Sequence, residues 1–352
     1  TARVPIGDIG KGLSAFPYIF MLGQDDNERI LGERLHDFGV DVQWNTELVA
    51  LKQGPGDVSV TLKQPDGTTR KLTCAWVAGC DGARSSVREL NGIVFPGAPY
   101  EHVFFDADTV ASGDMVEDEL NVYLWKKGFH LFFPMRGKDH WRVIGMLPTP
   151  LLGKPDLTFD EVVPSIRGEA GSRLAFHECA WFSTYRIHHR CAAQFRKGRC
   201  FLLGDAAHVH SPVGAQGMNT GLQDAYNLAW KLALVNKGDA NPKLLDTFEA
   251  ERLPVAQRLL RTTDRAFMLV VKDTWLAALF RTQIMARLAA TAMRAERVRK
   301  LAFRTISQIG IRYSGSALSR TLPGLPDGGP CAGDRFPWLN LKLRDDGPVE
   351  DL

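Results

Sequence analysis

The sequence predicts an α/β protein, mixed α+β overall, in which an antiparallel sheet interrupts a parallel-sheet framework. Two short apolar segments, Cys74–Ala78 and Cys200–Leu203, are each followed closely by glycine and aspartate and have the composition of buried parallel strands. Residues 99–190 instead alternate aromatic with polar positions, which is typical of antiparallel strands. From Asp264 to about Ser307 the chain is almost continuously helix-forming, so we expect a helical carboxyl-terminal region.

Length and charge restrict the class of protein. With 352 residues, of which 45% are hydrophobic, the chain is long enough for two domains or for one interleaved pair. The 43 basic residues nearly balance the 40 acidic ones, and a net charge of +3 gives no basis for binding nucleic acid or an anionic membrane. We therefore expect small molecules as partners.

The six cysteines indicate a reducing compartment. None forms a CxxC pair, and a chain of this length does not need disulfide bonds to hold a core. No stretch approaches the roughly 18 apolar residues of a membrane span, and the first residues lack a basic-then-apolar secretory pattern. These observations predict a cytoplasmic protein with free thiols and no membrane span.

The amino-terminal part predicts one helix and a group of strands. Apolar residues recur at helical spacing from Glu28 to Phe38, and Gly39 stands where a left-handed cap ends many helices. Pro55-Gly56 and Asp66-Gly67 punctuate the segment that follows. The strands expected around these turns are Val40–Trp44, Glu47–Lys52, Val58–Lys63 and, further along, Cys74–Ala78.

The middle of the chain predicts an antiparallel sheet, a buried strand and a long helix. The apolar run Cys200–Leu203 is the buried strand, and the helix follows a glycine-rich loop. The helix is expected to bury one apolar face that carries Leu222, Ala225, Ala229 and Leu232. The antiparallel strands are expected at Asn121–Trp125, Phe129–Pro134, Trp141–Met146 and Cys179–Ile187.

Arginines interrupt the apolar positions of the carboxyl-terminal helical region too often for a membrane span. We interpret them as a solvated helix face; the alternative is a surface through which two chains form a homodimer. The last segment, Thr321–Leu352, is rich in proline and glycine and is expected to be a surface strap or a linker. The arginines concerned are Arg281, Arg287, Arg294, Arg297, Arg299 and Arg304.

Two aspartates mark a candidate ligand site. In open α/β sheets, ligands bind outside the carboxyl ends of the strands, where Asp81 and Asp205 are expected. A carboxylate there accepts hydrogen bonds from sugar hydroxyls. The glycine-rich segment Ser211–Gly221 then leads into a helix, whose amino terminus suits a planar ring that becomes anionic, such as a reduced flavin. The plainer alternative is an ordinary glycine-rich turn before an ordinary helix.

Two segments resemble the hallmarks of one family. Gly198–Ala233 is similar to the second flavin-binding motif of the p-hydroxybenzoate hydroxylase family of flavoprotein monooxygenases. Gly79–Arg88 resembles that family's other hallmark, which serves both FAD and NAD(P)H. The likeness extends to Gln24, to Trp44–Leu48 and to Gly333–Pro337, and it is strongest toward the phenol and 3-(3-hydroxyphenyl)propionate hydroxylase branch.

The resemblance implies a Rossmann-like FAD-binding domain, incomplete at its amino terminus, interleaved with an antiparallel β-sheet substrate domain. Family members begin with a strand and a GxGxxG loop, which these residues lack, because Gly7, Gly10 and Gly12 have a different spacing. Either that segment lies upstream of Thr1 or the protein lacks it. The expected domains are residues 20–98 with 191–262 for FAD, 1–19 with 99–190 for substrate, 263–320 as the helical region and 321–352 as the strap.

The resemblance also implies roles for single residues. Asp205 would bind the ribityl chain of FAD, Gln24 its sugar-phosphate region and Leu48, through its backbone, the adenine. Asp81 and Gly82 belong to the hallmark shared by FAD and NAD(P)H. The flavin ring would be wrapped by Pro212, Gly214, Gly217, Met218 and Asn219, with Pro212 shaping the catalytic site.

Further candidates concern NAD(P)H, the substrate and other chemistries. Arg84 would meet a phosphate of NAD(P)H or act as a structural anchor. Phe182 and Tyr185 are expected in the wall of a pocket facing the flavin, with packing in the core as the alternative for each. Ser211 lacks a nucleophile elbow, which argues against a hydrolase. No metal site is expected, because no Asp, Glu or Cys completes a ligand set with the histidines at positions 188, 189, 208 and 210.

The function implied by the resemblance is hydroxylation of a phenolic ring. NADPH or NADH would reduce bound FAD, O₂ would form a flavin C4a-hydroperoxide, and an oxygen atom would pass to the small aromatic substrate. One alternative is hydroxylation or epoxidation of a polyketide or an alkene on the same framework. Another is a non-catalytic remnant of the fold, which the missing GxGxxG segment favours.

Overall fold

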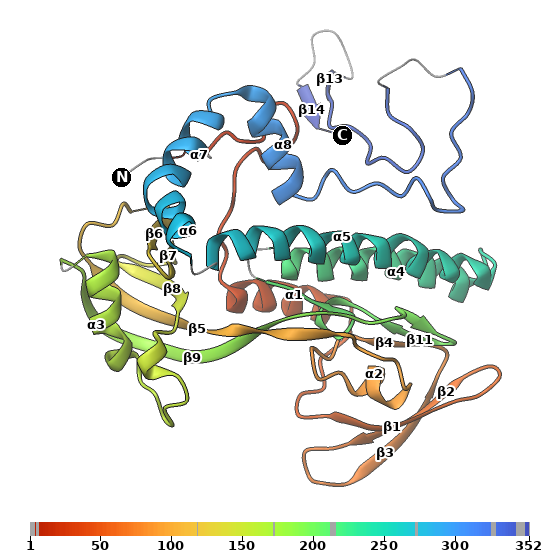
Figure 1. Cartoon of the computed structure of the whole chain (residues 1–352). Coiled ribbons are helices and arrows are strands. Elements are labelled where there is room, and N and C mark those ends of the chain that lie inside the picture. The colour runs from red at the N-terminus through yellow and green to blue at the C-terminus, as the bar shows by residue number, and fades with distance from the viewer. Residues whose placement is uncertain are drawn as a thin grey trace.

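The computed structural model describes residues 4, 7–117, 119–171, 173–211, 216–271, 274–324, 329–342 and 349–351. Its framework is a small mixed sheet with one parallel pair of strands, a three-stranded antiparallel sheet and a six-stranded antiparallel sheet, crossed by two long helices (Figure 1). This is the mixed α/β class that the sequence predicts. Within the described residues, no helix is both long and apolar enough to cross a membrane.

The first helix, α1 (Gln24–Asp37), begins earlier than expected and stops where the sequence indicates, since Gly39 follows with φ +73°. The structure does not form the strand expected at Val40–Trp44: the segment pairs with no strand among the described residues, and Trp44 is 73% exposed. Its apolar alternation fits a strand, but alternation without a hydrogen-bonded neighbour does not form one. The next three strands form the sheet β1-β2-β3, made of Glu47–Gln53, Val58–Lys63 and Thr69–Cys74.

The two strands expected before the glycine–aspartate turns run parallel to each other, but the first is displaced from the expected Cys74–Ala78: Cys74 ends β3, and the parallel strand begins at Val77 and is only partly buried. β11 (Cys200–Leu202) pairs with β4 (Val77–Gly79), and β10 (Arg196–Lys197) lies antiparallel on the other side of β11. Every residue of β11 is buried, which explains its uniformly apolar composition. Because Leu202 is opposite Gly79, the two strands end at the same edge of the sheet.

The six-stranded sheet has the order β12-β9-β5-β8-β7-β6 and is antiparallel throughout. β9 is longer than the strand expected at Cys179–Ile187, and β5 was not among the expected strands. Both strands extend from the large sheet toward the parallel pair β4 and β11 (Figure 1). β12 pairs with the end of β9 and directly follows the turn after β11, so it joins the two sheets. The bounds are β5 Gly97–Ser112, β6 Asn121–Trp125, β7 Gly128–Pro134, β8 His140–Met146, β9 Ala175–Cys191 and β12 His208–Val209.

The two faces of the large sheet have different neighbours. One face packs against α3 (Phe159–Ala170), with Phe105, Phe132 and Ile166 fully buried between them. The other face carries Phe104 and Phe129 and meets Phe267 of a long helix. Since side chains alternate along each strand, every residue of the sheet belongs to one of these two environments.

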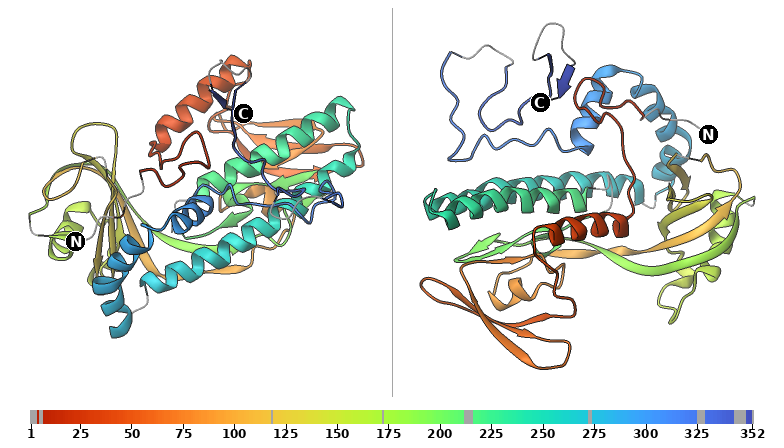
Figure 2. Two further views of the ribbon diagram at one scale, coloured as in Figure 1. Left: turned by 90° about the horizontal axis from the view of Figure 1, so that it is seen from above. Right: turned by 180° about the vertical axis from the view of Figure 1, so that it is seen from behind.

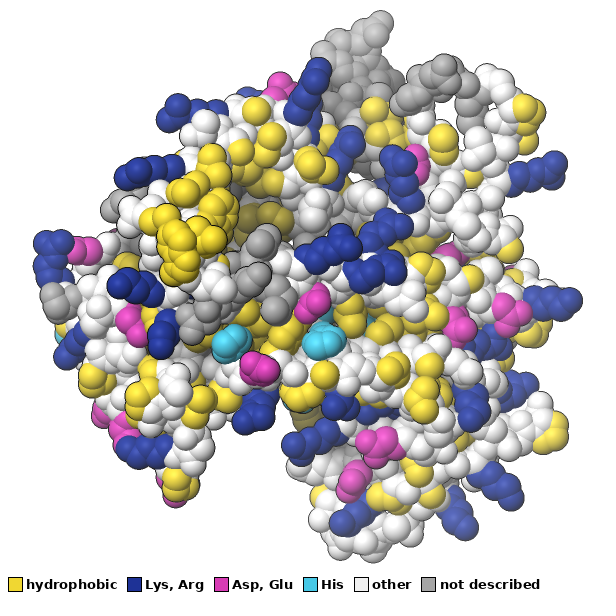
Figure 3. Space-filling view, in the orientation of Figure 1, with side chains coloured by type: hydrophobic (Ala, Val, Ile, Leu, Met, Phe, Trp, Pro, Cys, Tyr) yellow, Lys and Arg dark blue, Asp and Glu magenta, His cyan; other side chains and the backbone are white. Residues whose placement is uncertain are grey.

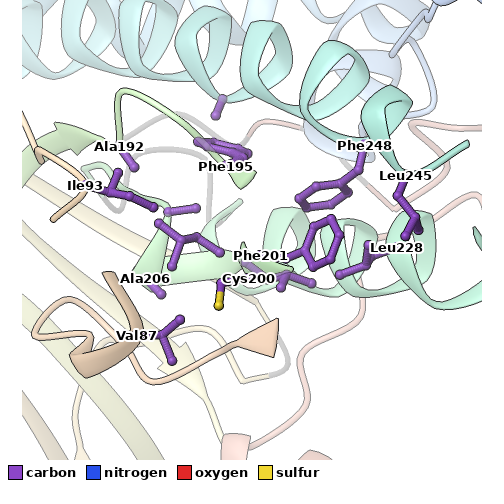
Figure 4. Close-up of a cluster of buried hydrophobic side chains, with 14 of the residues drawn as sticks. Val87, Ile93, Ala192, Phe195, Cys200, Phe201, Ala206, Leu228, Leu245 and Phe248 are labelled. Carbon is purple, nitrogen blue, oxygen red and sulfur yellow. The ribbon is translucent and has the colours of Figure 1, made fainter. Parts of the chain in front are cut away.

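Two long helices, α4 (Gly217–Lys237) and α5 (Asp246–Val271), lie side by side above the parallel strands (Figure 2). Between them and β11 lies an apolar core, in which Phe201 and Phe248 meet edge to face and Leu228 and Leu245 close the space (Figure 4). The short helix α2 (Ser86–Leu90) covers the opposite side of β4 and β11.

The face that α4 buries differs from the one predicted, of which only Leu232 packs, partly buried, against the core. Leu222 is 44% exposed, and Ala225 and Ala229 are exposed as well. The residues that α4 buries are mostly polar. Burial of the polar ones is possible because each of them has a charged or hydrogen-bonding partner on α5 or in the carboxyl-terminal segment. They are Thr220, Asp224, Asn227, Leu228 and Lys231.

The carboxyl-terminal region is helical, as expected, but one arginine is misassigned. Arg281 is 0% exposed and donates to the carbonyl oxygens of Trp125 and Lys126 at the end of β6, so it anchors this region to the large sheet. Hydrophobic side chains gather on the surface of this region (Figure 3), where Trp275 and Leu276 are exposed. The elements are α6 Trp275–Leu279, a π-helix Phe280–Met285, α7 Ala286–Ala292, α8 Glu296–Ile306, β13 Asn340–Lys342 and β14 Val349–Asp351.

The packing of the large sheet depends on Gly145 of β8. A β-carbon there would lie 2.3 Å from Nδ1 of His130 and 2.6 Å from Cζ of Phe105, both fully buried. Gly145→Ala is therefore expected to lower the free energy of unfolding by about 1–3 kcal/mol, measured by urea denaturation. Gly168→Ala in α3 is the matched control, because its β-carbon meets no atom within 4 Å. Equal effects of the two changes would contradict the packing described.

Candidate functional site

Two glycine–aspartate turns meet where β4 and β11 end. The carboxylate of Asp81 accepts a hydrogen bond from the backbone N–H of Val87 at 3.0 Å, so Asp81 also caps the turn before α2. Asp205 lies exposed in the turn after β11. Gly204 has φ +54°. A β-carbon on Gly221 would lie 3.2 Å from the Cα of Gly204. Glycine at both positions therefore lets the first turn of α4 approach the Asp205 turn.

Arg88 joins the two turns. Its side chain is buried and donates to the carbonyl oxygens of Ala206 (3.0 Å) and Ala83 (2.7 Å), and its guanidinium lies 4.0 Å from the centre of the Phe95 ring. Burial lowers the pKa of Arg88, but that value starts so high that the residue stays charged. Arg84, the residue singled out from the sequence, is exposed. The structural anchor of this motif is thus Arg88, which was overlooked although it belongs to the same segment.

The start of α1 lies beside the start of α4. The side-chain amide of Asn27 donates to Sδ of Met218 at 3.6 Å. Gln24, one turn before Asn27, is exposed and donates to Glu28 at 3.4 Å. The structure therefore brings Gln24 to the neighbourhood of Gly217, Met218 and Asn219. Pro212 and Gly214 lie outside the described residues.

Just before Pro212, the chain has polar side-chain atoms that lack hydrogen-bond partners among the described residues. They include Oγ of Ser211, a residue that is 0% exposed, and Nε2 of His210. Burial lowers the pKa of His210, which favours the neutral ring. Buried polar atoms are normally hydrogen-bonded, so orphaned ones beside an open strand edge fit a ligand with hydrogen-bonding groups.

A buried carboxylate holds the Asp205 turn in place. Asp224 of α4 accepts hydrogen bonds from the backbone N–H of Gly204 (3.1 Å), from Nε2 of His208 (2.7 Å) and from Nε of Arg252 (2.6 Å). Burial opposes its charge, but the hydrogen bonds and charges of His208 and Arg252 outweigh burial, so the pKa of Asp224 lies below its usual value. Arg252 also donates to the hydroxyl of Tyr313 at 2.8 Å.

A second buried pair adjoins the first along α4 and α5. Glu251 accepts hydrogen bonds from Lys231 (2.6 Å), Asn227 (2.7 Å) and Ser316 (2.6 Å). Together with the contact between Arg252 and Tyr313, these hydrogen bonds connect the chain after α8 to α4, the helix that begins in the glycine-rich segment Ser211–Gly221. None of these residues was identified from the sequence, because the partners of each lie far along the chain.

Two clefts open on this part of the molecule. The first, of about 940 Å³, lies between the β1-β2-β3 sheet and β4 and brings Leu48 and Asp81 to one wall. The second, of about 520 Å³, lies between the start of α1 and the large sheet and is lined by Gly23, Asp108 and Arg142, among others. Two of the residues expected to hold FAD thus share the first cleft. Among the described residues, no three His, Cys, Asp or Glu side chains are grouped to hold a metal ion.

The two aromatic residues expected in one pocket wall lie on opposite faces of the large sheet. Tyr185 is opposite Phe104 and belongs to the face that meets α5. Phe182 packs against Phe105 and Phe159 in the core under α3. Because the two positions are three residues apart on one strand, they cannot line one pocket. Tyr185 remains a candidate for the substrate side, whereas Phe182 is a core residue.

A parallel edge with two glycine–aspartate turns, next to a helix amino terminus, defines a nucleotide-cofactor-binding protein of the α/β class. Residues 7–263 match the family model described as FAD binding domain, and the chain belongs to that family. FAD is therefore its cofactor, and the Asp205 turn, the glycines and the orphaned polar atoms fit such a group.

Similar proteins include named monooxygenases. Over 310 residues the chain is 36% identical to 6-methylpretetramide 4-monooxygenase of Streptomyces rimosus, covering 88% of the chain and 55% of that protein. Over 254 residues it is 36% identical to pentachlorophenol 4-monooxygenase of Sphingobium chlorophenolicum, covering 70% and 46%. The solved structure of OxyS, an anhydrotetracycline hydroxylase from Streptomyces rimosus, superposes with a TM-score of 0.74 at 30% identity, covering 96% and 65%. The chain spans about half the length of the curated relatives that it matches.

Proposed function

We propose that the chain is the cofactor- and substrate-binding part of an FAD-dependent monooxygenase that hydroxylates a phenolic ring with NADPH or NADH and O₂. The observation that supports this most is the joined pair of turns at Asp81 and Asp205, held by Arg88 beside the start of α4. A large sheet whose α5-facing side carries aromatic residues extends from the same place, and an aromatic substrate is expected to bind among such residues.

The residues that would hold FAD come from three elements. Asp205 would bind the ribityl chain, Gln24 the sugar-phosphate region and Leu48 the adenine. A bound FAD would carry the reducing equivalents of NADPH or NADH to O₂ and so activate the oxygen atom that is transferred. The chain would contribute the unpaired N–H groups and positive end of α4, which stabilise negative charge on the ring. The other residues proposed around the ring and at the shared hallmark are Asp81, Gly82, Pro212, Gly214, Gly217, Met218 and Asn219.

Arg84 is the proposed contact for NAD(P)H. It is exposed on the turn after Asp81, whereas the neighbouring Arg88 is fully engaged within the protein. An exposed guanidinium beside the cofactor motif suits a phosphate group of a nicotinamide nucleotide.

A second candidate is a polycyclic aromatic substrate of the polyketide type. Two of the similar proteins are named for 6-methylpretetramide and anhydrotetracycline, whereas a third is named for pentachlorophenol. The cleft of about 520 Å³ leaves room for either a single ring or a fused system. Both candidates require the same flavin site and differ only in the ligand that fills the substrate side.

The proposal is tested with the chain and with a version extended to the start of its reading frame. We expect flavin absorbance to remain with the protein after gel filtration, and NADPH oxidation in air to be stimulated by a phenol. Stimulation by fused-ring phenols but not by single-ring phenols would select the polyketide-type substrate. If neither version retains FAD, or if no phenol stimulates NADPH oxidation, the proposal is wrong.

A further inference from the structure

The chain leaves α8 through a residue in an unusual backbone conformation. Gln308, two residues beyond the end of α8, has φ +59°, which is the left-handed region that glycine favours. After α1 and at the end of α4, the left-handed conformation belongs to Gly39 and Gly238. A side chain disfavours this conformation, because its β-carbon comes too close to a backbone carbonyl oxygen. The glutamine therefore needs an explanation beyond the ending of a helix.

The side chain of Gln308 is committed to α4. It is 7% exposed, and its amide is used as both donor and acceptor. Nε2 of Gln308 donates to Oγ1 of Thr220 at 2.7 Å, and its Oε1 accepts a hydrogen bond from Nε2 of Gln223 at 2.6 Å. A buried amide that is satisfied in this way fixes the position of its partners. The strained backbone thus coincides with two contacts to the beginning of α4.

A second contact joins the end of α8 to the same part of α4 (Figure 1). Nε2 of Gln216, the residue before α4, donates to the carbonyl oxygen of Thr305 at 3.0 Å. The carbonyl oxygen of Gln216 in turn accepts the hydroxyl of Thr220 at 2.8 Å. Gln216 and Thr220 are both buried. These hydrogen bonds therefore form one buried connection from α8 to the first turn of α4.

Another side of this turn lies against the Asp205 turn. Gly221 approaches Gly204 so closely that a β-carbon would lie 3.2 Å from its Cα, and Asp224 accepts the backbone N–H of Gly204 at 3.1 Å. The start of α4 is thus held between the Gly204 backbone and the end of α8. Because residues 217–219 directly precede Thr220, a displacement of Thr220 would also move the residues that we propose around the flavin ring.

We propose that Gln308 is a positioning residue of the flavin site, which holds the first turn of α4 in the place where it receives the ring of FAD. The inference rests on the proposed function, because it needs the flavin at the start of α4. The stabilisation that a helix amino terminus gives to negative charge falls off within one turn, so a small shift of this turn weakens it. Gln308 acts on the site through Thr220 and Gln223.

The first test removes the side chain without adding strain. Gln308→Gly suits the left-handed backbone and loses both contacts to α4. The matched control is Asp156→Gly, because Asp156 is also left-handed, with φ +52°, and lies exposed in the loop before α3. Hydrogen exchange of the apoprotein, followed by mass spectrometry, measures how often the start of α4 opens.

We expect the backbone amides of residues 220–225 to exchange about 10-fold faster in Gln308→Gly than in the wild type. Asp156→Gly should exchange in this segment as the wild type does. Equal exchange in all three proteins would show that Gln308 does not hold α4, and it would overturn the inference without reference to any cofactor.

The second test measures FAD itself, by titration of the same three proteins in the version extended to the start of the reading frame. We expect Gln308→Gly to raise the Kd for FAD roughly 10-fold and to change the visible circular dichroism of the bound flavin. Asp156→Gly should change neither. If Gln308 only ends α8, glycine replaces it well, and the variant keeps the wild-type Kd and flavin spectrum.

The third test asks whether Gln308 acts through Thr220. Thr220→Val keeps the shape of the side chain and removes the acceptor of Nε2 of Gln308. In the Gln308→Gly background, Thr220→Val should therefore raise the Kd for FAD much less than it does alone. Additive effects on Kd would contradict the proposed route. If the extended wild type retains no FAD, the proposed function fails and this inference with it. If the wild type binds FAD and Gln308→Gly binds it equally well, the inference alone fails.

Discussion

Asp224→Ala is expected to lower the free energy of unfolding by about 3–5 kcal/mol, because it leaves two buried groups without their partner. Arg252 is 0% exposed and would keep its charge, while His208, which is 1% exposed, would lose the acceptor for Nε2. The backbone N–H of Gly204 would lose its acceptor too. Urea denaturation monitored by fluorescence and by circular dichroism measures the change.

The control for this prediction is Asp239→Ala, an exposed aspartate just beyond the end of α4, which should change stability by less than about 0.5 kcal/mol. The double change Asp224→Leu with Arg252→Met removes both charges and should recover much of the loss. If Asp224→Ala costs no more than Asp239→Ala, the network does not stabilise the fold. Additive losses in the double variant would show that the two residues do not act as a pair.

Smaller losses are expected at the edge of the same network. Tyr313→Phe removes one hydrogen bond to Arg252 and leaves the charge of that residue paired with Asp224. We therefore expect a loss of about 1 kcal/mol, measured in the same urea experiment. A loss as large as that of Asp224→Ala would mean that the Tyr313 contact, and not the ion pair, holds the carboxyl-terminal segment in place.

The sequence predicted those parts of the fold that depend on local pattern. Val58–Lys63 and Asn121–Trp125 are strands with the expected bounds, because alternation and turn residues specify them directly. Cys200–Leu203 was correctly placed in a parallel sheet, because only a strand buried on both faces is apolar throughout. Val40–Trp44 has the same kind of local pattern but no neighbouring strand in the part of the chain that the structure describes, and it shows the limit of such reasoning.

The prediction failed where long-range partners decide the outcome. On α4, polar residues were assigned to solvent, yet Asp224 and Lys231 are buried because Arg252 and Glu251 of α5 pair with them.

Asp205→Ala is expected to weaken FAD binding without unfolding the protein. Asp205 is exposed in the turn after β11, so its removal leaves no buried group without a partner. If its carboxylate accepts hydrogen bonds from the ribityl chain, the loss should be about 1.5–3 kcal/mol, or roughly a 10- to 150-fold higher Kd. Quenching of FAD fluorescence on titration with apoprotein measures Kd, and the melting temperature of the apoprotein checks the fold.

Comparison of Asp81→Ala with Asp205→Ala separates effects on FAD binding from effects on protein stability, because the two aspartates differ in their contacts. The carboxylate of Asp81 already accepts the N–H of Val87, so its loss should lower both FAD affinity and the stability of the apoprotein. Asp205→Ala should lower affinity alone. An Asp205→Ala variant with wild-type Kd would mean that the ribityl chain binds elsewhere and that the carboxylate of Asp205 does not contribute to FAD binding. An Asp205→Ala variant that loses stability instead would mean that the turn itself, and not the cofactor, depends on this carboxylate.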